Sequence, residues 1–176
     1  PTDQTIGFAD VSVTPKGTVF STDGHAFQSP LFGMYTIMNI GAGLAVARIL
    51  GIEWAVLQKA VSELSQIPGR LEFIEAGQPF KVIVDYAFEP VAMGELYKIV
   101  AGFKPRHIIH VLGSTGGGRD KARRFTVGEL VGKKADFVIV TDEDPYETPP
   151  EEIMRDVTNA AARAGKQEGV NVWQIL

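Results

Sequence analysis

The sequence predicts an α/β protein with a parallel sheet in its C-terminal part, and two observations support this fold class. Beyond residue 71, short apolar runs rich in β-branched residues alternate with longer runs of helical character, which is the pattern of βαβ units. The run Val82–Val84 is apolar throughout, as in a strand that is buried on both faces of a parallel sheet.

The composition is that of an ordinary globular protein and excludes several kinds of function. The 176 residues are 45% apolar and 22% charged, and the net charge of −4 offers no basic surface for nucleic acid. The lack of cysteine excludes disulfides, thiolate zinc sites and a cysteine nucleophile. No apolar run is as long as a membrane span, and the polar start Pro1–Gln4 does not resemble a signal peptide. We therefore expect a cytoplasmic protein, and the sequence does not predict its oligomeric state.

Residues 1–33 are expected to form β structure. The alternation in Ala9–Thr14, the turn at Pro15–Gly17 and the return through Thr18–Ser21 predict a hairpin. Thr22–Gly24 is a second turn signal. Strands this short are not stable alone, so they must belong to a larger body.

Two helices and a linker follow. Met34–Leu50 is long and apolar, so we expect a mostly buried helix with its C-terminal cap at Gly51. Asn39 lies inside this helix, and a buried amide needs partners, either in the protein or in a ligand. Glu53–Leu64 predicts a second, more amphipathic helix. Gln66–Arg70 contains proline and glycine and predicts a linker.

We place the domain boundary at this linker, with domains 1–69 and 70–176. The second domain is expected to contain three strands, each followed by a helix, with right-handed crossovers. The strands and their helices are Lys81–Asp85 with Val91–Gly102, His107–Leu112 with Phe125–Gly132, and Asp136–Val140 with Glu151–Ala164.

Three polar loops, Asp85–Pro90, Gly113–Arg124 and Asp142–Pro149, follow these strands. Because parallel strands end at one edge of a sheet, we expect the loops to lie together, where open α/β sheets bind ligands. The loops expected at the opposite edge are short. Asp85 either contacts a ligand at this edge or simply starts a turn.

The glycine-rich loop is a candidate anion site. Its backbone N–H groups can cradle an anion at a helix start, and it ends in a cationic cluster formed by Arg119, Lys121, Arg123 and Arg124. The alternative is a solvated, charged helix entry. The spacing of the glycines fits neither a Walker A loop nor a dinucleotide fingerprint.

The segment Asp142–Glu147 contains four carboxylates in six positions. Either a cation such as Mg²⁺, an amine or an arginine neutralises them, or they favour the start of the next helix through its dipole. His25, His107 and His110 lack metal-ligand spacing and are interpreted as structural. No residue is assigned as catalytic and none as a metal ligand.

Five short motifs, in this order, resemble those of the Mur ligase family: Gly33 with Asn39, Ile67–Arg70, Val84–Ala87 with Pro90, Gly116–Lys121, and Thr141 with Asp144 and Pro145. The resemblance covers essentially the whole chain, and it is to the members that add the third residue of the peptidoglycan stem peptide. It implies an ATP-dependent ligase that phosphorylates a carboxylate of UDP-N-acetylmuramoyl-dipeptide. An incoming amino acid then attacks the acyl phosphate through its amine, while Mg²⁺ neutralises phosphate charge.

The resemblance also implies three domains: a UDP-substrate domain, a central P-loop ATPase domain and a C-terminal Rossmann-like domain. This chain would correspond to the tail end of the central domain followed by most of the C-terminal one. We therefore expect a fragment that lacks the P-loop and the Mg²⁺ ligands, is inactive by itself, and has a mobile hinge near Arg70.

Site residues are carried over only where positions match. Asn39 matches the family asparagine that contacts adenine, Arg70 the linker arginine that reaches the ATP phosphates, and Asp85 the aspartate that contacts the ribose. Arg119 matches the arginine that binds the carboxylate of the incoming amino acid, a task that suits a guanidinium fork.

Three departures from the family pattern affect the expected site. Phe88-Glu89 replaces His-Thr, so that nucleotide contact is not carried over, and Gly118 replaces the first aspartate of Gly-Gly-Asp-Arg-Asp. Asp144 and Tyr146 stand where diaminopimelate-adding members have the asparagine and arginine of Asp-Asn-Pro-Arg. An acidic and a neutral side chain suit a cationic substrate, so we hypothesise that a lysine-like residue is added.

Two other functions remain open from the sequence. One is a Mur-like ligase with another acceptor, of the folylpolyglutamate or cyanophycin type. The other is a Rossmann-like binding module without catalysis.

Overall fold

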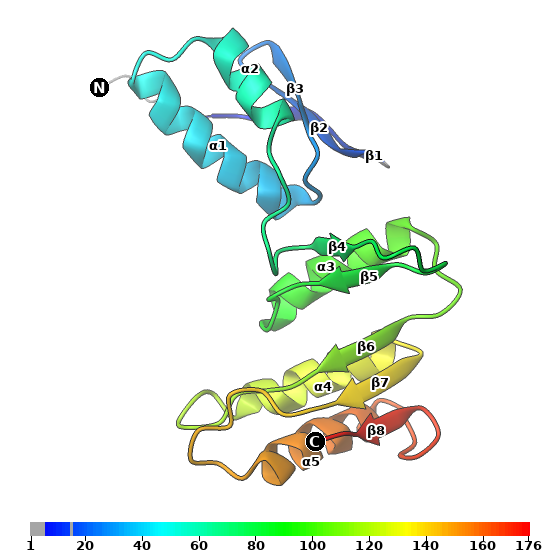
Figure 1. The fold of residues 1–176 in the computed structure, drawn as a ribbon. Coiled ribbons are helices and arrows are strands. Elements are labelled where there is room, and N and C mark those ends of the chain that lie inside the picture. The colour runs from blue at the N-terminus through cyan, green and yellow to red at the C-terminus, as the bar shows by residue number, and fades with distance from the viewer. Residues whose placement is uncertain (1–5, 15) are drawn as a thin grey trace. The chain divides into compact units, whose positions relative to one another are not determined.

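The computed structural model describes residues 6–14 and 16–176. The polar start of the chain and Pro15 of the first expected turn lie outside the described residues. The chain divides into two compact units, Pro1–Tyr86 and Ala87–Leu176 (Figure 1). Each unit has a buried apolar core of its own.

The N-terminal unit begins with an antiparallel sheet of order β1-β2-β3, whose strands are Ala9–Thr14, Gly17–Thr22 and His25–Ser29. The expected hairpin is confirmed as β1 and β2, and β3 adds a third strand after the second turn. Phe20 and Phe27 face each other across β2 and β3, are buried, and stack with ring centroids 5.2 Å apart. Helices pack on this aromatic pair.

Helices α1 (Met34–Ile49) and α2 (Trp54–Ser62) pack on the sheet through Ile37, Leu44, Leu57 and Val61. The prediction that α1 is mostly buried is wrong. Only Ile37, Gly41 and Leu44 are buried in it, whereas Met38, Val46 and Ile49 are more than half exposed. The reason is that the described residues pack against only one side of α1. The apolar side chains on its other sides therefore stay exposed.

The linker is followed by a two-stranded antiparallel sheet of β4 (Glu72–Ile74) and β5 (Val82–Val84). Two expectations for β5 are wrong: it pairs antiparallel with β4, and it is not buried on both faces, since Val84 is 44% exposed. Backbone hydrogen bonding outside the strands contributes to this pairing, because the Tyr86 N–H donates to the Gly69 carbonyl oxygen over 2.9 Å. A strand of three residues carries no period that could reveal its partner.

The C-terminal unit contains the expected parallel sheet. Its strand order is β6-β7-β8, and three helices alternate with these strands along the chain. The elements are α3 (Pro90–Gly102), β6 (Ile109–Leu112), α4 (Ala122–Lys134), β7 (Phe137–Val140), α5 (Pro150–Arg163) and β8 (Val172–Gln174). The α/β fold class is therefore confirmed, and β8 is an addition to it.

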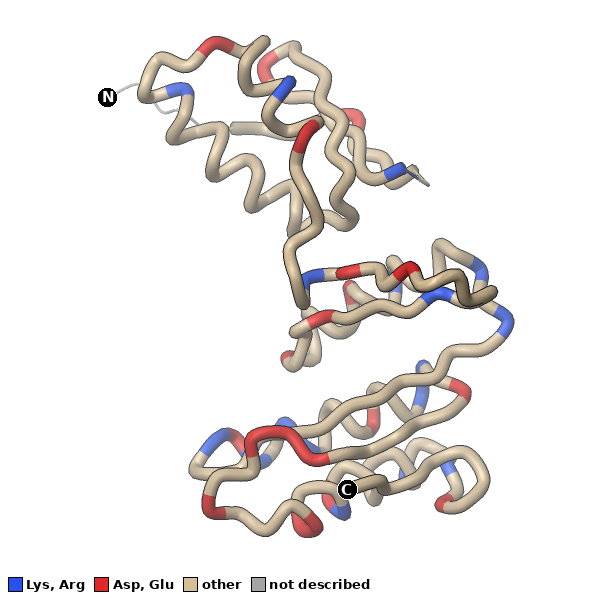
Figure 2. The backbone as a smooth tube through the Cα atoms, viewed as in Figure 1, with Lys and Arg blue, Asp and Glu red and all other residues tan. Residues whose placement is uncertain are grey.

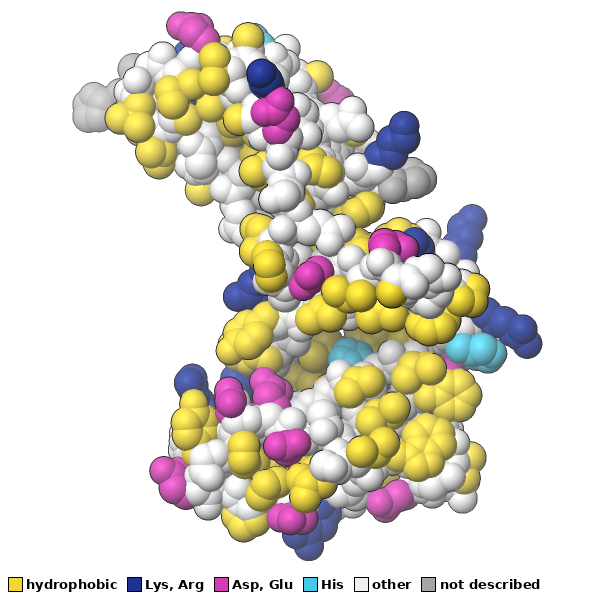
Figure 3. Space-filling model, viewed as in Figure 1, with side chains coloured by type: hydrophobic (Ala, Val, Ile, Leu, Met, Phe, Trp, Pro, Cys, Tyr) yellow, Lys and Arg dark blue, Asp and Glu magenta, His cyan; other side chains and the backbone are white. Residues whose placement is uncertain are grey.

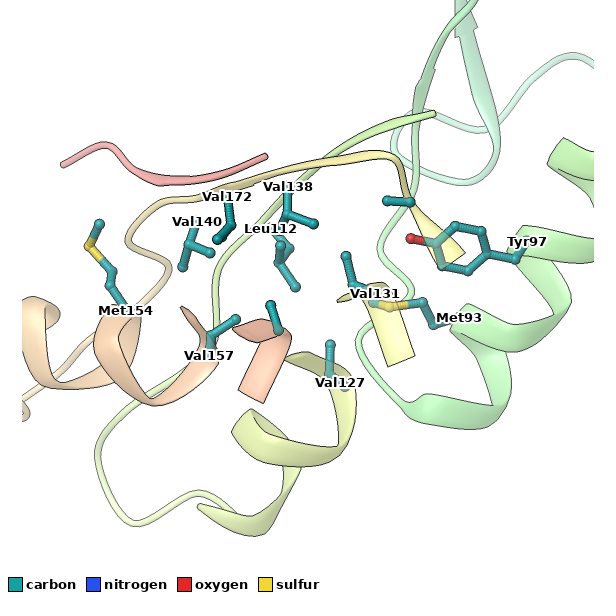
Figure 4. Close-up of a cluster of buried hydrophobic side chains, with 12 residues drawn as sticks. Met93, Tyr97, Leu112, Val127, Val131, Val138, Val140, Met154, Val157 and Val172 are labelled. Carbon is teal, nitrogen blue, oxygen red and sulfur yellow. The ribbon is translucent and has the colours of Figure 1, made fainter. Parts of the chain in front are cut away.

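The core of this unit lies between one face of the sheet and its helices (Figure 4). Val138, Val140 and Val172 are fully buried there, against Val131 of α4 and Val157 of α5. The alternate strand residues form the other face, where apolar side chains gather on the surface (Figure 3). Ile109 and Val111 on that face are 64% and 59% exposed. None of the helices among the described residues is long and apolar enough to cross a membrane.

Candidate functional site

Arg70 and Asp85 lie at one place in the N-terminal unit although fifteen positions separate them. The Leu71 N–H donates to Asp85 Oδ2 over 2.7 Å, which fixes the carboxylate beside the linker. The Arg70 guanidinium lies over the Tyr86 ring, with its carbon 4.8 Å from the ring centroid. Leu71 has a φ of 49°, a left-handed backbone that costs free energy for a leucine. The linker thus presents a cation next to a carboxylate held by the backbone.

Helix α1 contributes to this group through a residue that the sequence analysis missed. Burial, and then the charge of Asp85, raise the pKa of Tyr35 to about 12, and the charge of Arg70 opposes them. The Tyr35 hydroxyl is buried and has no hydrogen-bond partner among the described residues. Asn39 lies one helical turn further on, and its side chain is exposed, contrary to the buried amide that we expected. The (i, i+4) spacing from Asn39 could have revealed Tyr35.

Two of the expected edge loops pack directly on each other in the C-terminal unit. The Gly116 N–H donates to the Asp144 carbonyl oxygen over 3.1 Å, and the Gly117 N–H to Thr148 Oγ1 over 3.1 Å. Glycine is required here, because a Cβ on Gly116 would lie 2.0 Å from the Pro145 carbonyl oxygen. The expectation that loops meet at one sheet edge is confirmed for these two, as Figure 2 also shows for their acidic and basic stretches. It is wrong for the third loop, Asp85–Pro90, because β5 before it pairs with β4 in a separate sheet.

The cationic cluster divides into residues that are paired within the protein and one that is not. Lys121 and Arg124 form ion pairs with Glu152 and Asp156 of α5, and Arg123 forms one with Glu89, at 2.9 Å. These three cations are therefore neutralised by carboxylates of the protein, an arrangement that was neither of the two alternatives considered. Arg119 is exposed and forms no ion pair in the part of the chain that the structure describes. It is therefore the available cation of the glycine-rich loop.

Asp144 and Tyr146 lie in the loop that holds the glycine-rich loop. Both are exposed and both have left-handed backbone, with φ of 37° and 50°. Tyr146 packs closely on Gly117, where a Cβ would lie 2.6 Å from the Tyr146 Cβ. Strained backbone of this kind is held only by its surroundings and is common at binding sites.

The acidic stretch of this loop has a cation near it. Burial, and then the charge of Asp144, raise the pKa of Glu143, and the charge of Arg123 opposes them. An arginine is thus close to these carboxylates, one of the two arrangements expected. Among residues 6–14 and 16–176, no group of three or more histidine or carboxylate side chains is arranged to hold a metal ion.

Comparison with known proteins identifies the family. The family model described as "Mur ligase, glutamate ligase domain" matches residues 69–174, more than half of the chain. The chain belongs to the Mur ligase family. The family that the sequence motifs resemble is therefore confirmed.

Curated members of the Mur ligase family are similar over most of this chain. A UDP-N-acetylmuramyl-tripeptide synthetase of Roseiflexus sp. (strain RS-1) is 40% identical over 142 residues, which are 79% of this chain and 27% of the relative. A UDP-N-acetylmuramoyl-L-alanyl-D-glutamate–2,6-diaminopimelate ligase of Solibacter usitatus (strain Ellin6076) is 34% identical over 137 residues, 78% of this chain and 28% of the relative. The matched part of this chain thus spans between a quarter and a third of the length of these relatives.

A solved structure is similar to this chain in fold. The folylpolyglutamate synthase of Mycobacterium tuberculosis complexed with ADP has a TM-score of 0.76 to this chain, at 21% identity. The similarity covers 98% of this chain and 38% of the solved chain. It follows that this chain and that protein share a fold at low identity.

Proposed function

We propose that this chain is part of an ATP-dependent ligase that adds an amino acid to UDP-N-acetylmuramoyl-dipeptide in peptidoglycan synthesis. The observation that carries the proposal is the pair of packed loops, in which Asp144 and Thr148 hold the loop that presents Arg119. A guanidinium without a carboxylate partner among the described residues suits the carboxylate of an amino acid. The names of the relatives at 34% and 40% identity support this acceptor.

The residues around Arg70 fit a nucleotide. Arg70 supplies a cation for phosphate, and the Asp85 carboxylate, which accepts from the Leu71 N–H, is an acceptor of the kind that a ribose hydroxyl needs. Asn39 offers an exposed amide for the base. ATP, when bound, supplies the phosphoryl group that activates the substrate carboxylate. We propose that the P-loop and the Mg²⁺ ligands belong to a part of the protein outside this chain, so the chain alone is inactive.

The first experiment is amino-acid-dependent ADP release by the full-length protein. UDP-N-acetylmuramoyl-dipeptide is supplied with lysine or diaminopimelate in parallel. We expect release with lysine, because Asp144 and Tyr146 together are more anionic than the asparagine and arginine of the diaminopimelate motif. Diaminopimelate used more than tenfold better than lysine would overturn the lysine proposal and keep the ligase. No release with either, from a protein that binds ATP, would favour another acceptor or a non-catalytic binding module.

Arg119→Ala tests the amino-acid site. We expect the KM for the amino acid to rise about 10- to 150-fold, the equivalent of one charged hydrogen bond of about 1.5–3 kcal/mol, with the KM for ATP unchanged. Arg106→Ala is the matched control, because Arg106 is an exposed arginine in the loop between α3 and β6. Equal KM values for the two variants would remove Arg119 from the site.

The pair Asp144→Asn and Tyr146→Arg tests the choice of amino acid. We expect the double variant to gain use of diaminopimelate and lose use of lysine, because it removes a negative charge and adds a guanidinium for the distal carboxylate. The measurement is the ratio of kcat/KM for the two amino acids. An unchanged ratio would place the specificity of the enzyme elsewhere.

A further inference from the structure

Arg123 lies in the first turn of α4 and bridges two separate segments of the C-terminal unit. Its Nη1 donates to Glu89 Oε1 over 2.9 Å, and its Nη2 donates to Thr115 Oγ1 over 2.6 Å. Its side chain is only 11% exposed, and its guanidinium carbon lies 4.8 Å from the centroid of the Phe88 ring. One planar fork therefore contacts the segment before α3 and the glycine-rich loop at the same time.

The neighbouring cations act differently. Arg124 and Lys121 form ion pairs with Asp156 and Glu152, which joins α4 to α5. Of the three paired cations, Arg123 is the one that contacts a loop carrying a proposed ligand residue. It therefore has a role beyond helix packing.

The glycine-rich loop needs such support. Gly113–Arg119 contains four glycines, so its conformational entropy when unrestrained is high. Gly116 and Gly117 are held by the Asp142–Pro149 loop, while Thr115, directly before them, is held by Arg123. Arg119 follows two residues after the last of these contacts, so its position depends on them.

The contacts of Arg123 also account for a departure in the sequence. Phe88 and Glu89 replace the His-Thr of the family motif, and the structure places both against Arg123. Glu89 offers a charge-assisted acceptor and Phe88 an aromatic face, and a guanidinium suits both. The three residues thus form one unit, which we call the Arg123 clamp.

We propose that Arg123 is a positioning residue of the amino-acid site: through Thr115 and Glu89 it holds the glycine-rich loop so that Arg119 can bind the substrate carboxylate. The inference rests on the proposed function for the role of Arg119. The clamp itself contacts no reacting atom.

Substitutions of Arg123 in the full-length protein test this. We expect Arg123→Met to raise the KM for the amino acid about 10- to 100-fold, since a small displacement of a binding group has effects of this order, and to leave the KM for ATP within about twofold. Arg123→Lys should recover part of the loss, because an ammonium keeps the ion pair with Glu89 without bridging to Thr115. Arg124→Lys is the matched control and should keep the wild-type KM. An unchanged KM in Arg123→Met would overturn the proposal.

Two further measurements test the proposal if Arg123→Met does not fold or if the wild-type protein shows no activity. If Arg123→Met does not fold, Thr115→Val and Glu89→Gln each remove one partner of Arg123, and wild-type KM values in both would overturn the proposal. The second measurement, hydrogen exchange of this chain, does not depend on ligase activity. Arg123→Met should speed exchange of the amides of residues 116–119, and Thr115→Val takes its place if Arg123→Met is unfolded. The control Arg124→Lys should not speed this exchange. Equal exchange would also overturn it. Wild-type protein without ligase activity would contradict the proposed function and leave the exchange result to decide the clamp.

Discussion

At the residue scale, Tyr97 and His110 form a polar pair in the C-terminal unit. The Tyr97 hydroxyl lies 2.6 Å from His110 Nδ1. Burial raises the pKa of Tyr97 and lowers the pKa of His110 to about 4. Both groups are therefore neutral at physiological pH, and the tautomer of the imidazole sets which of the two donates the hydrogen bond. This satisfies a histidine on the helix-covered side of β6, in line with the structural role expected for it.

This pair makes stability depend on pH. The folded-state pKa of His110 is about 4, below the ordinary value of 6.5, so the unfolded state takes up the proton first as pH falls. The stabilisation by the neutral imidazole is complete above pH 6.5 and decreases toward pH 4, by at most about 1.4 kcal/mol per pH unit. We expect urea unfolding of His110→Gln to depend less steeply on pH in this range than that of wild type. Identical slopes would contradict the buried, neutral histidine.

At the element scale, α4 and α5 approach each other closely at glycines. A Cβ on Gly128 would lie 2.6 Å from the Val157 carbonyl oxygen and 2.8 Å from the Ala160 Cβ. Because the first of these is backbone, the helices would have to move apart. This close contact aligns α4 with α5. Lys121 and Arg124 lie at the start of α4 and form their ion pairs with α5 there.

Gly128→Ala should therefore destabilise the protein by about 1–3 kcal/mol, the usual effect of overpacking. Gly94→Ala in α3 is the matched control, because a Cβ added at Gly94 would have nothing within 4 Å of it among the described residues. It should stabilise by about 0.5–1 kcal/mol, through the higher helix propensity of alanine. The measurement is the free energy of unfolding in urea. Equal effects of the two substitutions would contradict the close helix contact.

At the scale of the whole molecule, the two compact units have separate cores. Phe20 and Phe27 belong to the first core, and Val138 and Val140 to the second. Each unit contains one of the two tryptophans, Trp54 in the first and Trp173 in the second. Each tryptophan can therefore report on the unfolding of one unit. Because the two cores are separate, the two units need not unfold together.

Phe20→Ala should lower the stability of the first unit by about 3–5 kcal/mol, because it leaves a cavity in the buried aromatic pair. We expect the unfolding transition of Trp54 fluorescence, measured in a Trp173→Phe background, to shift strongly. The Trp173 transition, measured in a Trp54→Phe background, should stay nearly constant. The reciprocal variant Val138→Ala should shift the Trp173 transition. Parallel shifts of both reporters would show one cooperative unit.

Much of the fold followed from sequence, because local patterns specify local structure. The β-branched run Phe137–Val140 and the periodicity of α5 depend only on neighbours along the chain, and both elements were predicted within a residue or two at each end. The glycine-rich loop and its meeting with Asp142–Pro149 followed from one topological rule, that parallel strands end at the same edge.

Tertiary structure alone decided the features that depend on contacts between distant residues. Strands β4 and β8 have three residues each, too few for a period, and β5 takes β4 as its partner through non-local hydrogen bonds. The sequence determined that Arg119 belongs to a cluster of four cations. Only the fold decided that three of them pair with carboxylates 28 to 35 positions away in the chain, which leaves Arg119 available. Charge is a local property of the sequence, whereas its neutralisation depends on which side chains the packed backbone brings within a few ångströms.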